Sequence, residues 1–161
     1  MSDQTIFKRL KKDHETHREL LNRIESMTGD SEERRQLFRN FRMEVTAHAA
    51  AEEETLYSTM LEDPELRHDG QHSVAEHHEL DELMAELADK DMSEGAWTEK
   101  FKKLKHDYLH HIDEEEEDMF PAAKEELSTA EAKQLGEKFE ERKPEEYDRA
   151  LAGKDMEDTR E

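Results

Sequence analysis

Residues 48–57 read HAAAEEETLY and residues 111–120 read HIDEEEEDMF, and these two stretches decide the fold. Each begins with a histidine that is followed four positions later by a glutamate. Residues four apart lie on the same face of a helix, about 6 Å apart along its axis. Both stretches are therefore predicted to be helices, each of which can aim one histidine and one glutamate at a single point.

The two stretches belong to an internal repeat, which becomes visible when the chain is shifted against itself so that His48 falls on His111. The same offset places His14 on His77, so the first histidine precedes the second by the same distance in each half. Further pairs at this offset are Leu20 with Leu83, Phe38 with Phe101, and Glu53 with Glu116. Each half is thus a predicted helical hairpin, with its first histidine at the same depth as the His-x-x-x-Glu pair of the partner helix.

Apolar residues recur at intervals of three and four along four long segments, which predicts four amphipathic helices. These run from Ser2 or Asp3 to Met27, from Asp30 or Ser31 to Asp63, from Gln71 to Asp89, and from Asp91 or Ser93 to Phe120. We expect Pro64 and Pro121 to end the second and fourth helices, because the residue before a proline is pushed out of helical geometry.

Connections of a few residues force neighbouring helices to run antiparallel. We therefore expect an all-α fold, an up-down-up-down antiparallel four-helix bundle over residues 1–127 with a C-terminal helical extension over residues 128–161. The extension is predicted to hold a fifth helix from about Thr129 to Arg142 and, beyond Pro144, a frayed polar tail.

The chain has 161 residues and a formal net charge of −21. Such an acidic surface argues against nucleic acid and against an anionic membrane as partners, while a protein partner is left open. Because there is no cysteine, thiolate metal sites and disulfides are excluded. The sequence shows no apolar run of about 18 residues and no signal-peptide segment, so the expected location is cytoplasmic.

Six polar residues fall on the inward stripes of the predicted helices. They are His14, His48, Glu52, His77, His111 and Glu115. Burying these charges without partners would be costly, and two metal ions would remove that cost, with each glutamate able to bridge them. Imidazole and carboxylate without thiolate suit iron, manganese or zinc, and two bridging carboxylates in a bundle suit a pair of iron ions best.

The remaining candidates favour structural roles. His17 lies on the inward stripe, but its repeat partner is Leu80, so packing or support of a ligand is favoured over ligation. The other histidines fall mostly off the stripes and are expected in solvent; they are His68, His72, His78, His106 and His110. Tyr57 and Tyr108 are expected in the core, and only Glu115 of the run 114–117 is expected to face inward.

Over residues 5–127 these motifs resemble the hemerythrin-like, or HHE cation-binding, family. The motifs are Asp13-His14, His48-x-x-x-Glu52, Glu76-His77-His78, and His111-Ile112-x-x-Glu115 followed by Phe120-Pro121. The resemblance implies a non-haem di-iron centre with the six residues named above as its ligands. Oxygen-carrying members have a further histidine four residues before the one at His77. Here that position is Ser73, which speaks against reversible oxygen carriage.

Three functions are compatible with these patterns. The first is a di-iron protein that binds or senses O₂, NO, peroxide or iron. The second is an enzyme that uses the same centre to consume peroxide or activate oxygen. The third is a metal-free helical interaction protein, for which the acidic faces and the fifth helix are the evidence.

Overall fold

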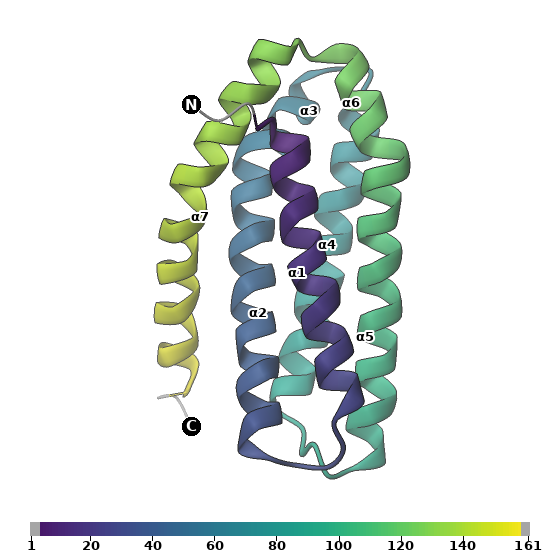
Figure 1. Cartoon of the computed structure of the whole chain (residues 1–161), viewed down its shortest axis with the longest axis vertical. Helices are drawn as coiled ribbons and strands as arrows, with labels where there is room; N and C mark the ends of the chain where they lie inside the picture. Colours follow the sequence, from purple (N-terminus) through teal and green to yellow (C-terminus); the bar gives the residue numbers. More distant parts are fainter. Residues whose placement is uncertain (1–3, 159–161) are drawn as a thin grey trace.

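Four long helical segments run up and down the molecule and are joined by short connections at its ends (Figure 1). They are α1 (Ile6–Ser26), α2 (Glu32–Glu52), α4 (Arg67–Ala88) and α5 (Gly95–Glu114). Shorter pieces extend α2 and α5: η1 (Glu53–Tyr57) and α3 (Ser58–Glu62), then η2 (Glu115–Met119) and α6 (Phe120–Glu126). This computed structural model describes residues 4–158, and it confirms the predicted antiparallel four-helix bundle.

Local capping sets where the helices begin. Thr5 is extended and its side chain accepts from the backbone N–H of Lys8, so α1 begins at Ile6. The caps predicted at Ser2 or Asp3 lie outside the described residues. Ser31 caps α2 as expected.

Two helices begin elsewhere than predicted. The carbonyl of Asp63 accepts from the N–H groups of Leu66 and Arg67, so the turn after Pro64 leads directly into α4, ahead of the predicted start at Gln71. The carboxylate of Asp91 accepts from both the backbone and the hydroxyl of Ser93. These bonds form a turn that precedes α5, which begins only at Gly95.

A π-helical turn follows the His-x-x-x-Glu motif in both halves of the chain. Ser58 N–H donates to the Glu53 carbonyl, and Phe120 N–H donates to the Glu115 carbonyl, each five positions back. The prediction that Pro121 ends the helix is wrong, because the chain continues as α6. Pro121 stands in the first turn after the π-helical segment, where a missing N–H costs little.

The fifth helix, α7 (Thr129–Asp158), lies alongside α2 and also contacts α1 (Figure 1). The prediction that it ends near Arg142 and frays beyond Pro144 is wrong, since the helix passes through Pro144. Next to the proline, Lys143 forms ion pairs with Asp13 and Glu44 of the bundle. Such tertiary contacts offset the backbone hydrogen bond that a proline removes. The division into residues 1–127 and 128–161 stays a prediction.

A buried polar layer divides the apolar core into two clusters. One cluster lies towards the α1–α2 connection and includes Ile24, Phe41 and Trp97. The other lies towards α3 and α6 and includes Leu56 and Phe120. In the described part of the chain, no helix is long and apolar enough to cross a membrane.

Candidate metal centre

The six predicted ligands come together in the polar layer between the two apolar clusters. Five of them, His14, His48, Glu52, His111 and Glu115, have at most 2% of their surface exposed. The side chain of His77 is 9% exposed. α1, α2, α4 and α5 therefore each contribute to one buried site, with η2 supplying Glu115.

Each glutamate lies near histidines from both halves of the repeat. Glu52 Oε1 is 3.8 Å from His48 Nε2 and 3.3 Å from His77 Nε2. Glu115 Oε1 is 2.7 Å from His111 Nε2 and 4.0 Å from His14 Nε2. Each carboxylate therefore lies between a histidine of one half and a histidine of the other.

The candidate ligand atoms form two groups that share one glutamate. Glu52, His77, His111 and Glu115 each offer one atom, and these atoms all lie within 4.8 Å of one another. His14, His48 and Glu52 do the same. Ligand atoms held about 2.0–2.2 Å from one ion lie only a few ångströms apart, so both groups have the dimensions of a cation site.

All four histidines bind a carboxylate through their outer nitrogen, Nδ1. His48 donates to Asp13 over 2.8 Å, His111 to Glu76 over 2.9 Å, His14 to Glu116 over 2.7 Å, and His77 to Glu53 over 3.1 Å. A carboxylate can only accept, so each Nδ1 carries a proton, and in the neutral ring the lone pair on Nε2 then faces the centre. Such partners orient metal-binding histidines and make them better ligands.

The contacts of these four carboxylates with the histidines were not predicted from the sequence, although the repeat contains a signal for them. Asp13 and Glu76 fall on each other at the repeat offset, and so do Glu53 and Glu116. Glu115 is the one buried member of the run 114–117, as expected, and the partly exposed Glu116 accepts from the outer nitrogen of His14.

Several inner atoms have no hydrogen-bond partner among the described residues. They are Nε2 of His14 and of His48 and both carboxylate oxygens of Glu52. A buried polar group left without a partner costs about 1–3 kcal/mol, and more when it is charged. Lone pairs that face one another in a buried space fit a bound cation, which would accept all of them.

The shifted pKa values of the buried glutamates and histidines also favour a bound cation in this layer. Burial and the neighbouring carboxylate of Glu115 raise the pKa of Glu52 well above its usual value. Burial lowers the pKa of His48 to about 3. Burial also acts to lower the pKa of His111, but the charge of Glu115 outweighs it and raises that pKa to about 9. A dication among these groups would offset the repulsion between the glutamates and keep the histidines neutral.

The surroundings of the two halves are related but unequal. The ring of Tyr57 lies 5.2 Å from that of His77, and its repeat partner Phe120 stacks on His14 at 6.1 Å. His17 is fully buried and accepts from the Tyr108 hydroxyl over 2.6 Å while donating to Glu44 over 3.0 Å. With both of its nitrogens engaged, His17 supports the site rather than ligating a metal.

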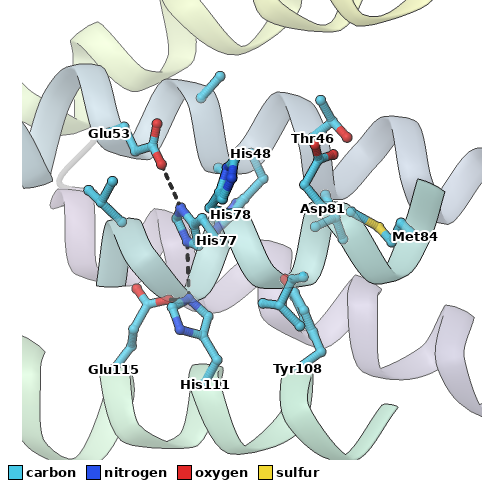
Figure 2. Close-up of a pocket in the computed structure, with 15 residues that line it drawn as sticks. Thr46, His48, Glu53, His77, His78, Asp81, Met84, Tyr108, His111 and Glu115 are labelled. Carbon is cyan, nitrogen blue, oxygen red and sulfur yellow. Dashed lines mark hydrogen bonds and ion pairs between the residues drawn. The ribbon is translucent and has the colours of Figure 1, made fainter. Parts of the chain in front are cut away.

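A cavity of about 340 Å³ opens between α2 and α4 and reaches the centre from one side (Figure 2). His77, His111, Glu115 and Tyr108 form part of its wall (Figure 2). A small molecule can therefore reach His77 and His111, and also His48, which lines the same cavity.

The remaining histidines are exposed, as expected; they are His68, His72, His78, His106 and His110. His72 lies 3.4 Å from Glu76 and 3.3 Å from Glu114 on the surface. Exposed pairs of this kind are common in acidic proteins and do not define a site.

A helical bundle whose core holds repeated histidine and glutamate ligands defines a class of cation-binding domains. Residues 5–123 match the hemerythrin HHE cation-binding domain family, and the chain belongs to this family. The structure is similar to the crystal structure of a hemerythrin HHE cation-binding domain-containing protein from Mycobacterium kansasii, with a TM-score of 0.81 and 28% sequence identity. The similarity covers 92% of this chain and 91% of that chain. No curated protein shows a significant match.

Proposed function

We propose that the chain is a non-haem di-iron protein that binds or senses O₂, NO, peroxide or iron. Its six metal ligands are His14, His48, Glu52, His77, His111 and Glu115. The observation that carries this proposal is the set of four histidines whose outer nitrogens are held by carboxylates. Their inner nitrogens are thereby left to face the two buried glutamates.

Iron is favoured because the donors are imidazole and carboxylate, with manganese and zinc as alternatives. Four histidines and two glutamates cannot fill six positions around each of two ions, so positions remain for an exogenous ligand. The cavity beside His77 and His111 supports ligand access at that half.

Metal analysis of protein produced with ample iron tests the proposal. We expect two ions per chain, and a clear loss of metal in His48→Ala and in His111→Ala. His78→Ala is the matched control, because the His78 side chain is 77% exposed and pairs with Glu82 on the surface of α4. A ratio well below one ion per chain, with helicity retained in circular dichroism, would contradict the proposal.

A second function, an enzyme that consumes peroxide or activates oxygen, is favoured by one further observation. Tyr108 lines the cavity, and its hydroxyl is bonded to the buried His17. While it donates to His17, this hydroxyl can still accept a hydrogen bond from a protonated ligand, such as hydrogen peroxide, that arrives beside His111. Turnover of peroxide by the iron-loaded protein, with Tyr108→Phe lowering kcat at unchanged metal content, would establish this function. The metal-free interaction protein is disfavoured, because the family binds cations.

A further inference from the structure

We propose that α7 is a functional part of the metal centre. Lys143 and Phe139 hold His48, so that the position formed by His14 and His48 exchanges its metal more slowly than the one formed by His77 and His111. This inference rests on the two-metal site proposed above and concerns a segment that lies outside the matched residues 5–123.

Lys143 acts on His48 through a single carboxylate. Its Nζ lies 3.0 Å from Asp13 Oδ2 and 2.9 Å from Glu44 Oε2. The same Asp13 Oδ2 accepts from His48 Nδ1 over 2.8 Å. Arg9 binds the other oxygen of Asp13, so both oxygens are fixed and the carboxylate cannot rotate away from His48.

Phe139 covers His48 from the outside. It is fully buried, and its ring meets that of His48 edge-on at 5.6 Å. The backbone of α7 also lies close to the start of α1, because a Cβ at Gly136 would come within 2.9 Å of the Gln4 carbonyl. On the side of His48 that faces α7, metal or water can therefore pass only if α7 moves.

Among the residues that the structure describes, none covers the equivalent groups of the other half in this way. Glu76, the repeat partner of Asp13, holds His111 but is 22% exposed, and it pairs on its outer side with the exposed His72. The cavity between α2 and α4 is lined by both His77 and His111, whereas of the other pair it is lined by His48 but not by His14 (Figure 2). The repeat thus supplies two similar ligand sets, and α7 makes them unequal.

Release of metal to a chelator tests this inequality. The full-length protein is loaded with Zn²⁺ and mixed with excess chelator, and we expect a fast and a slow phase of equal size. Lys143→Gln should accelerate the slow phase about tenfold, the lower end of the effect seen when groups that orient metal ligands are removed. The fast phase should keep its rate, and Lys143→Arg should restore the slow one.

Two variants assign the phases and one controls for general loosening of α7. Asp13→Asn should accelerate the same phase as Lys143→Gln, whereas Glu76→Gln should accelerate the other. Arg142→Gln is the matched control, because Arg142 ties α7 to Glu54 rather than to Asp13. It should leave both rates unchanged.

The outcomes separate the two proposals. If Arg142→Gln accelerates release as much as Lys143→Gln does, or if both phases respond equally, α7 is only a general support and the inference is overturned. Release of both ions at one rate also overturns it, while leaving the two-metal site intact. A wild-type protein that binds fewer than two ions defeats the proposed function as well.

Discussion

Asp13 and Glu76 occupy equivalent positions in the two halves of the repeat and make the same contact, each accepting a hydrogen bond from Nδ1 of the second histidine in its half. The internal repeat therefore extends beyond the ligands to the groups that orient them. Glu53 and Glu116 are also repeat partners, but each accepts from a histidine of the opposite half. Glu53 accepts from His77, and Glu116 accepts from His14. These crossed contacts tie the two halves into one centre.

Removing either member of this pair should weaken one metal position selectively. We expect Asp13→Asn to lower metal affinity at the His14/His48 position by about 10–100-fold, since an amide holds the histidine less firmly than a carboxylate. Glu76→Gln should do the same at the His77/His111 position. Competition with a chelator of known affinity measures both. Glu82→Gln, on an exposed pair with His78, should have no effect. Unchanged affinity in Asp13→Asn would show that His48 needs no such partner.

Metal affinity at the His77/His111 position should rise with pH. With a pKa of about 9, metal-free His111 is charged at neutral pH and carries a second ring proton, on Nε2. Binding must displace that proton, so affinity at the His77/His111 position should increase as the pH rises from about 7 to 9. His48, with a pKa of about 3, is already neutral there and adds no such dependence.

Calorimetric titrations in buffers of different ionisation enthalpy measure the protons released on binding. We expect release on filling the His77/His111 position at pH 7 and little release above pH 9. Proton release that does not change over this range would show that His111 is neutral in the metal-free protein.

The helices and the candidate ligands could be predicted because both depend on local spacing. Apolar periodicity predicts α2 and α5, and a histidine four positions before a glutamate places both side chains on one face. Features that depend on contacts between helices could not be predicted from such local patterns. Pro144 lies inside α7 because Lys143 is held by Asp13 and Glu44, a relationship that no local pattern contains.

Ser73, which stands where oxygen-carrying relatives have a histidine, is packed inside the core and has little room for a larger side chain. Ser73 is fully buried and its hydroxyl donates to Met119 Sδ over 3.0 Å. We expect Ser73→His to lower the free energy of unfolding by about 1–3 kcal/mol, because the larger ring must displace neighbouring core atoms. Urea denaturation measures the loss, with Ser73→Ala as the control for the hydroxyl alone. A stable Ser73→His protein with an altered visible spectrum would instead show that the ring fits and ligates.

The close approach of α7 to the start of α1 can be tested at two glycines of the same helix. A Cβ at Gly136 would meet the Gln4 carbonyl at 2.9 Å and the Ile6 nitrogen at 3.1 Å, and backbone atoms cannot turn aside as a flexible side chain can. Alanine is favoured over glycine inside a helix by about 1 kcal/mol, but overpacking costs about 1–3 kcal/mol, so Gly136→Ala should be destabilising overall. At Gly153 a Cβ meets nothing within 4 Å, so Gly153→Ala should be neutral or slightly stabilising. Thermal unfolding of both variants gives the comparison, and a higher Tm for Gly136→Ala than for the parent protein would show that α7 does not lie against α1 at this distance.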